Sequence, residues 1–376
     1  MTSENSSTHI YDVIVVGGGA AGVGIGVALQ HADVENFLVL DRHMVGASFA
    51  MWPAETRFIS PSFATNAIGM LDLNSVAIGV SPAYSLGVEH PTGEEFAKHL
   101  VSVADYFELP VREDTEVLEI TRTDDHFVVR TNEGRLLAKH VVWAAGEFQY
   151  PVEGVIDGSE HCRHTATVER YGDLDGDEFL VIGGYESGID AAYHLALQGK
   201  RVTVLDSECP WDDESSDPSI ALSTYSLERM RDPLFKKHVE LFANTPVAAV
   251  AAEGDAFAVT SEEGRRFETG RPPLLAAGFA GSHRLVDDLF EQRSDGFPLL
   301  NKDDESTITP GLFLCGPSVR HGNNVFCFIY KFRQRFAVVA KKIATSLGLE
   351  AEYLESYRDW GMYLDDLSIC GEDCVC

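Results

Sequence analysis

Two stretches of the chain share one pattern of apolar and polar positions. In the first, the apolar run Y-D-V-I-V-V at 11–16 leads through glycines into the helical segment V-G-I-G-V-A-L-Q and then into N-F-L-V-L-D, which ends at Asp41. In the second, F-L-V-I at 179–182 leads into I-D-A-A-Y-H-L-A-L-Q-G and then into R-V-T-V-L-D, which ends at Asp206. Short apolar runs rich in β-branched residues are typical of buried strands. Each stretch therefore predicts a strand–helix–strand unit.

The segments that follow repeat this plan and place the second copy inside the first. Alternating stretches with turn residues between them predict antiparallel meanders at 115–143 and near 247–268. The acidic segment 207–233 predicts a loop with a short helix near 224–231, and T-P-G-L-F-L-C-G-P at 309–317 precedes a helix from about 325 to 347. We predict an α/β fold of two nested Rossmann-like, three-layer domains, the second inserted in the first. The outer domain comprises 1–151 and 281–360, the inner domain 152–280, and a mobile cysteine-containing tail 361–376.

The first glycine cluster carries a dinucleotide-binding pattern. Gly17, Gly19 and Gly22 form G-x-G-x-x-G directly between a predicted strand and a predicted helix. The first glycine permits the tight turn, the second lets the backbone approach a pyrophosphate, and the third allows close helix–strand packing. Asp41 ends the next strand, where a carboxylate can bind ribose hydroxyls. The alternative is a glycine-rich helix turn without a ligand.

The second glycine cluster carries a less complete form of the same pattern. Gly183 and Gly188 frame G-G-Y-E-S-G, but Tyr185 occupies the middle position, where glycine would allow close approach. Asp206 ends the next strand and favours a free ribose 2′-hydroxyl over a 2′-phosphate, so NADH is favoured over NADPH. Arg201 or Arg229 would reverse this preference if either reached the site. The alternative is a degenerate nucleotide domain that serves as a scaffold.

These motifs occur in an order that resembles a known family. With A-A-G-E at 144–147, G-G-Y-E-S-G-I-D-A-A at 183–192 and T-P-G-L-F-L-C-G-P at 309–317, the chain resembles the two-dinucleotide-binding-domain flavoproteins of the pyridine nucleotide-disulfide oxidoreductase superfamily. Within them it is most similar to the thioredoxin-reductase-like branch of the bacillithiol-disulfide reductase type, through G-G-x-x-S-x-x-D-A-A and G-N-N before an aromatic-rich helix. The resemblance implies FAD in the outer domain and NAD(P)H in the inner one. It also implies Gly146 and Gly316 as FAD-site residues, with Asn323 and Asn324 either capping a helix or contacting the flavin.

Two departures separate the chain from many disulfide reductases. It lacks a cysteine pair beside the flavin, and Gly316-Pro317 stands where many relatives carry Gly-Asp. Cys315 and Cys327 are predicted to be buried core thiols, and the cationic side chains of the following helix are predicted to be solvated. Those side chains are Lys331, Arg333 and Arg335.

The segment M-W-P-A-E-T-R-F-I-S-P-S-F at 51–63 resembles flavin monooxygenases instead. In one interpretation Trp52, Glu55, Thr56 and Arg57 line the active site. In the other, Trp52 is a core residue and Glu55 and Arg57 form a salt bridge.

The resemblance predicts an enzyme that takes a hydride from NAD(P)H onto FAD and passes the electrons to a small-molecule or small-protein disulfide. A flavin monooxygenase and a non-catalytic nucleotide-binding redox sensor are the alternatives. No metal site is expected in the folded part. Cys370, Cys374 and Cys376 are candidate catalytic residues, because a thiol-bearing arm could replace the missing cysteine pair. Metal capture by these thiolates, or an incidental role, remain the alternatives.

The charge balance restricts the partners of this chain. The net charge of −30, with 20 Arg and 9 Lys, argues against binding to nucleic acid or to anionic membranes. Dispersed acid with few lysines indicates a surface adapted to high salt, and a merely acidic mesophilic protein is the alternative. The first ten residues are polar and no run of about 18 uncharged apolar residues occurs, so a cytoplasmic protein is expected. A homo-oligomer is also expected.

Overall fold

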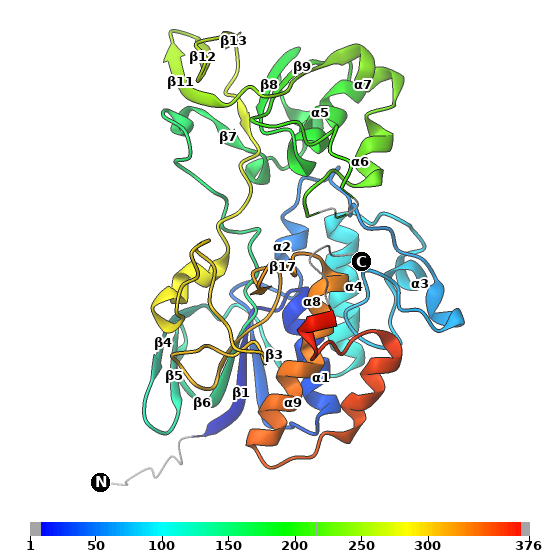
Figure 1. The fold of residues 1–376 in the computed structure, drawn as a ribbon, viewed down its shortest axis with the longest axis vertical. Coiled ribbons are helices and arrows are strands. Elements are labelled where there is room, and N and C mark those ends of the chain that lie inside the picture. The colour runs from blue at the N-terminus through cyan, green and yellow to red at the C-terminus, as the bar shows by residue number, and fades with distance from the viewer. Residues whose placement is uncertain (1–8, 216, 218, 370–376) are drawn as a thin grey trace.

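Two α/β units share one chain in the computed structural model, which describes residues 9–215, 217 and 219–369 (Figure 1). The large unit contains a seven-stranded sheet and the small unit a five-stranded sheet. Each unit has its own apolar core. The predicted α/β class with two Rossmann-like units is therefore confirmed.

The large sheet combines parallel and antiparallel pairing in the order β3-β2-β1-β6-β5-β4, with β15 also paired to β6. The bounds of these strands are β1 Ile10–Val16, β2 Phe37–Leu40, β3 Val111–Arg112, β4 Val117–Arg122, β5 Phe127–Thr131, β6 Gly134–Trp143 and β15 Leu312–Leu314. β6 pairs along one edge with β1, and along the other with β5 at its start and β15 at its end. The carboxyl ends of β1, β6 and β15 therefore meet, with Val16 opposite Trp143.

Helices cover the large sheet, and one of them begins directly where a strand ends. α1 (Ala20–His31) follows β1 directly and packs against α9 (Phe336–Ser346). Gly24 permits this approach, because a Cβ at that position would lie 2.1 Å from the Phe336 ring. α4 (Gly93–Tyr106) also contacts α1 and begins at a capping box between Thr92 and Glu95. The amino-terminal end of α1 therefore points at the edge where the carboxyl ends of the strands meet.

The small unit has a wholly parallel sheet in the order β10-β9-β8-β14-β7 and a separate antiparallel meander. The bounds of its strands are β7 Arg163–His164, β8 Glu178–Ile182, β9 Arg201–Leu205, β10 Val239–Phe242, β11 Val247–Glu253, β12 Ala256–Ser261, β13 Arg266–Thr269 and β14 Leu274–Leu275. Its helices are α5 (Glu186–Leu197), α6 (Thr224–Arg229) and α7 (Pro233–His238). All of them lie between β6 and β15 along the chain, so the small unit is inserted in the large one.

The chain crosses between the units twice, and the two crossings lie side by side (Figure 1). The backbone N–H of Ala280 donates to Tyr150 O at 2.8 Å, and that of Val152 donates to Gly278 O at 3.0 Å. The boundaries predicted at 151/152 and 280/281 fall on this paired connection. The exact positions of these boundaries stay a prediction.

The helix predicted from 325 to 347 is shorter and interrupted. β16 (Arg320–His321) and β17 (Asn324–Val325) form a hairpin, and α8 (Ile329–Phe332) is separated from α9 by a 3₁₀ turn. The prediction that Lys331, Arg333 and Arg335 are solvated is wrong, because all three are buried. Each cation has tertiary hydrogen-bond partners, which offset part of the cost of burying its charge.

Those partners lie far away in the sequence. Arg335 donates to both carboxylate oxygens of Asp304, at 2.9 and 2.8 Å. Arg333 donates to the backbone oxygen of Ser75 at 2.9 Å, and Lys331 pairs with Asp217 at 2.8 Å.

The segment predicted as a mobile tail is partly packed on the large unit. Met362 is buried, and the backbone N–H of Leu364 donates to Gln334 O at 3.0 Å. The expectation of a mobile tail therefore does not hold for its first residues, and 370–376 lie outside the described residues. In the described part of the chain, no helix combines the length and the apolar character needed to cross a bilayer.

Candidate functional site

The glycine turn after β1 has the geometry that a phosphate cradle requires. Gly17 has φ +108°, a conformation open to glycine, and a Cβ there would lie 2.5 Å from Ala144 O. A Cβ on Gly22 would lie 1.7 Å from Gly17 O, so only glycine allows α1 to pack this close to the turn. A Cβ on Gly19 would meet no atom within 4 Å. The middle glycine therefore faces open space at the amino-terminal end of a 12-residue helix.

A cavity of about 380 Å³ begins at this turn and extends to the small unit. Gly17, Gly19 and Asp41 line its start, and Ser187 and Asp190 of α5 line its far end. The site is thus made by both units.

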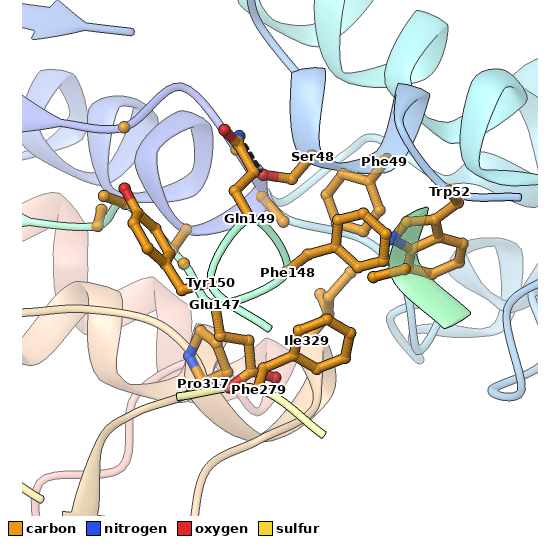
Figure 2. A pocket seen from close by; sticks show the side chains of 18 of the residues that line it. Ser48, Phe49, Trp52, Glu147, Phe148, Gln149, Tyr150, Phe279, Pro317 and Ile329 are labelled. Carbon is orange, nitrogen blue, oxygen red and sulfur yellow. Dashed lines mark hydrogen bonds between the residues drawn. The ribbon is translucent and has the colours of Figure 1, made fainter. Parts of the chain in front are cut away.

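Aromatic side chains form one wall of this cavity. Figure 2 shows Phe49, Trp52 and Phe148 grouped together and Phe279 near Glu147 and Pro317. The ring centroids of Trp52 and Phe148 are 6.2 Å apart, and those of Phe148 and Phe279 are 5.2 Å apart. Such a wall suits a flat, largely apolar ring system.

Asp41 and its surroundings supply polar groups at the start of the cavity. Its carboxylate accepts the backbone N–H groups of Gly18 at 2.7 Å and His43 at 2.8 Å. Burial raises the pKa of Asp41, and these hydrogen bonds oppose the shift without cancelling it. Arg42 donates to Gln149 at 3.0 Å, and Gln149 donates to Ser48 at 2.9 Å (Figure 2).

A buried network joins the two units at the far end of the cavity. Thr56 Oγ1 donates to Asp190 Oδ2 at 2.6 Å, and Arg229 donates to Asp190 Oδ1 at 2.6 Å. Burial acts to raise the pKa of Asp190, but the hydrogen bond to His194 and the charge of Arg229 outweigh it and lower that pKa to about 2. Asp190 is therefore ionised, and it ties the 51–63 segment to α5.

Glu55 makes a second tie between the units. Its carboxylate accepts the backbone N–H groups of Tyr171 at 3.1 Å and Gly172 at 2.9 Å. Arg57 donates to His90 O at 2.8 Å and does not pair with Glu55. Trp52, Thr56 and Arg57 line the cavity, and their role in an active site stays a prediction. The alternative of a Glu55–Arg57 salt bridge is wrong.

The second glycine turn repeats the backbone of the first but is more closely covered. Gly183 has φ +100°, and a Cβ on Gly188 would lie 1.8 Å from Gly183 O. Asp206 accepts the backbone N–H of Gly184 at 2.5 Å, as Asp41 does in the large unit. The middle position differs, because the hydroxyl of Tyr185 donates to Ala221 O at 3.1 Å.

The side chain of Trp211 adds to this cover. A Cβ on Gly184 would lie 2.5 Å from the Trp211 ring, so the segment after β9 folds back onto the turn. Neither Arg201 nor Arg229 contacts Asp206. Arg229 is buried against Asp190, and Arg201 pairs with Glu178.

The structure brings together some of the residues predicted for the cofactor sites and not others. Those that line the cavity are Gly17, Gly19, Asp41, Trp52 and Gly146. Those that do not line it are Gly22, Gly183, Gly188, Asp206, Gly316, Asn323 and Asn324. Gly22, Gly183, Gly188 and Asp206 shape the two turns, and Gly316 precedes Pro317, which does line the cavity.

The two asparagines have a different structural role. Asn324 pairs with His321 in the β16–β17 hairpin, and Asn323 is exposed at its tip. The N-cap of α8 is Phe328 without a side-chain hydrogen bond, so the prediction that either asparagine caps the helix is wrong.

Several residues that line the cavity were not predicted from the sequence. Glu147 and Phe148 follow the A-A-G motif, and their position after a strand end was the one available signal. Asp190 belongs to the motif G-G-x-x-S-x-x-D-A-A but was not predicted to line a cavity, and Phe279 carried no local signal. The place of both residues in the cavity depends on how the units pack. Within the described residues, no group of three His, Cys, Asp or Glu side chains is arranged to hold a metal.

The cysteines differ in their surroundings. Cys315 is buried in the core, as predicted, whereas Cys327 lines the cavity with its Sγ 3.1 Å from Ser219 Oγ. Cys370, Cys374 and Cys376 lie outside the described residues.

Comparison with known proteins agrees with this architecture. Residues 14–316 match the family model described as pyridine nucleotide-disulphide oxidoreductase. The uncharacterized oxidoreductase CzcO of Bacillus velezensis is 29% identical over 204 residues, 52% of this chain and 54% of that protein. A ferredoxin–NADP reductase of Streptococcus pneumoniae is 23% identical over 205 residues, 53% and 54% of the two chains. The chain thus spans about half the length of the curated relatives it matches.

Solved structures share the fold at low sequence identity. The bacillithiol disulfide reductase from Staphylococcus aureus superposes with a TM-score of 0.72 at 17% identity, over 90% of this chain and 99% of that one. A flavin-containing monooxygenase from Stenotrophomonas maltophilia gives a TM-score of 0.69 at 16% identity, over 89% and 98%. Since the family model covers most of the sequence and the nested sheets match its fold, the chain belongs to the pyridine nucleotide-disulphide oxidoreductase family.

Proposed function

We propose that this chain is an FAD-dependent NAD(P)H oxidoreductase that passes electrons to a disulfide substrate. Membership of the family implies a flavin and a nicotinamide nucleotide as cofactors. The observation that carries the proposal is the continuous cavity, which leads from the open Gly19 turn to the small unit. A cavity shared by two dinucleotide-type units suits electron transfer between two nucleotides.

The residues of the large unit fit FAD. The open space at Gly19 and the amino-terminal end of α1 would hold the pyrophosphate, and Asp41 would bind ribose hydroxyls. The wall formed by Trp52, Phe148 and Phe279 would exclude water from the ring. When bound, the flavin supplies hydride acceptance and onward electron transfer, while the protein supplies position and electrostatics.

Anaerobic mixing tests this function directly. NADH should bleach the oxidised flavin spectrum of the purified protein, and a disulfide such as bacillithiol disulfide or oxidised thioredoxin should then restore it. Thiols should appear at about two per NADH consumed, as the stoichiometry of a two-electron disulfide reduction requires. A flavin that NADH does not reduce would contradict the proposal.

NADH should reduce the flavin at least about tenfold more efficiently than NADPH, a difference of about 1.4 kcal/mol. The carboxylate of Asp206 would accept from a 2′-hydroxyl and repel a 2′-phosphate, and Arg201 and Arg229 are engaged elsewhere. Asp206→Ser should reduce the preference, while Glu262→Gln, on an exposed turn of the small unit, should keep it. Comparing kcat/KM for both donors decides the point, and equal values in the parent enzyme would refute the assignment of Asp206.

Truncation after Ser368 should leave flavin reduction by NADH unchanged and slow disulfide turnover at least about 100-fold, as loss of a nucleophile would. The reason is that Cys370, Cys374 and Cys376 would relay electrons in place of a cysteine pair at the flavin. Cys209→Ser, whose thiol lies outside the cavity lining, is the matched control. Undiminished disulfide turnover by the truncated enzyme would eliminate the relay, and metal analysis of the intact protein would then test metal capture.

A flavin monooxygenase is the second candidate, and one observation favours it. Of the four described cysteines, only Cys327 lines the cavity, whose walls are mainly aromatic and apolar. A site of this kind suits an apolar organic substrate. Oxygen consumption coupled to oxygenation of an organic compound, with no release of thiol from disulfides, would support this candidate over disulfide reduction.

A further inference from the structure

The carboxylates that line the cavity differ in whether they have partners. There are five among the described residues: Asp41, Glu116, Glu147, Glu186 and Asp190. The carboxylates of Asp41 and Asp190 accept the hydrogen bonds described above. Glu116 pairs with Arg42 at 3.9 Å, and Glu186 accepts from the hydroxyl of Ser226 at 2.6 Å. Within the described chain, the carboxylate of Glu147 forms no hydrogen bond or ion pair.

Glu147 occupies an enclosed part of the cavity wall. It follows Gly146, whose φ of +67° turns the chain after β6, and its side chain lies beside Pro317 and Phe279 (Figure 2). It retains some accessible surface because it faces the cavity, although protein atoms enclose it.

The charge of Arg320 acts on Glu147, but the guanidinium of Arg320 is hydrogen-bonded elsewhere. Its guanidinium donates to the backbone oxygen of Val319 at 2.8 Å and stacks over the Phe297 ring at 4.2 Å. Burial raises the pKa of Glu147, and the charge of Arg320 only partly opposes this. The carboxyl group thus keeps its proton to a higher pH than an exposed glutamate does.

Glu147 also lies within electrostatic reach of Cys327. Burial raises the pKa of the Cys327 thiol, and Glu147 adds to this when it is ionised, whereas Ser219, Lys331 and Arg320 oppose it. The proton-bearing carboxyl and the one described thiol of the cavity therefore belong to the same region of its wall.

Disulfide reduction requires a proton that the nicotinamide does not supply. In NADH + H⁺ + RSSR → NAD⁺ + 2 RSH, the hydride carries two electrons and one hydrogen. The sulfur–sulfur bond breaks, and the second sulfur leaves as a thiolate that needs one further proton. We propose that the carboxyl of Glu147 donates this proton to the departing sulfur and regains one from solvent. This inference rests on the proposed function.

Glu147→Gln should retain the FAD content and the rate of flavin reduction by NADH, because neither needs the acid. Re-oxidation of the reduced enzyme by a disulfide should slow by about 100-fold, at the lower end of what a general acid contributes. In the parent enzyme this rate should fall as pH rises through the raised pKa of Glu147, and in Glu147→Gln this limb of the profile should disappear. Glu153→Gln, which removes an exposed carboxylate from the same connection, should behave as the parent.

A second measurement is independent of turnover. Infrared difference spectra between the parent and Glu147→Gln should contain the carbonyl band of a protonated carboxyl group at pH values above about 4.3, the ordinary glutamate pKa. Finding that this group titrates at or below that ordinary value would overturn the inference. Equal re-oxidation rates and pH profiles for parent and variant would also overturn it while leaving the proposed function intact. A parent enzyme that no disulfide re-oxidises would contradict the proposed function instead.

Discussion

Gly19→Val should yield folded protein without bound FAD. The backbone at Gly19 is extended (φ −81°, ψ −165°), which valine adopts readily, and a Cβ there meets no protein atom within 4 Å. The added side chain would occupy the space through which a pyrophosphate approaches the backbone. The FAD content, measured from the ratio of flavin to protein absorbance, should fall from about one FAD per chain to near zero. The Kd of added FAD should rise at least about tenfold, which corresponds to about 1.4 kcal/mol.

Two further variants separate loss of the ligand from loss of the fold. Gly270→Val introduces the same side chain at an exposed position that also has no atom within 4 Å of the Cβ, and it should bind FAD normally. Gly22→Val would place its Cβ 1.7 Å from Gly17 O and should destabilise the large unit itself. A Gly19→Val protein that is fully loaded with FAD would refute the location of the pyrophosphate site.

Asp190→Leu should lower the free energy of unfolding by about 3–5 kcal/mol, the cost of leaving a buried charge without its partner. Arg229 is 7% exposed and its guanidinium lies 2.6 Å from Asp190. Arg229→Met should cost a similar amount, because it leaves Asp190 as the unpaired charge. The double variant Asp190→Leu/Arg229→Met should lose much less than the sum of the two single losses. Urea denaturation of the four proteins measures this coupling, and additive losses would contradict the existence of the pair.

The contribution of Asp190 should also depend on pH in a defined direction. The pKa of Asp190 in the folded protein, about 2, is lower than its ordinary value of 3.8. The stabilisation is therefore complete above the ordinary pKa and declines as pH falls through the folded-state pKa. The difference in stability between the parent and Asp190→Leu should shrink between about pH 4 and pH 2. A difference that stays constant over this range would mean that Asp190 is not stabilised as an anion.

Local backbone geometry explains which parts of the fold were predictable. Gly17 and Gly183 occupy positive φ values of +108° and +100° after buried strands, and a Cβ on Gly22 or Gly188 would collide with the preceding turn. These requirements act within a few residues, so the glycine spacing alone predicts both turns. The two meanders and the insertion of one unit in the other follow from apolar alternation and from the order of the strands.

The burial of the cationic side chains after Phe328 could not be predicted from the local sequence. A lysine or arginine near a helix is usually solvated, because burying a charge is costly unless a partner is present. The partners of Arg335 and Lys331 are Asp304 and Asp217, 31 and 114 residues away. Only the tertiary fold brings these residues into contact. The sequence pattern alone therefore predicted that the cationic side chains are exposed to solvent.

The sequence by itself determined the α/β class, the two glycine turns and their strand-end carboxylates Asp41 and Asp206, because each depends on contacts between near neighbours in the chain. The tertiary structure alone decided which side chains share the cavity and which of them have partners. Asp190 is held by Thr56 and Arg229, whereas Glu147 faces the cavity without a hydrogen bond in the described chain. The contact of Thr56 with Asp190 joins the two units across 134 positions, and the contact of Arg229 with Asp190 lies within the small unit across 39 positions, so neither follows from near neighbours in the sequence.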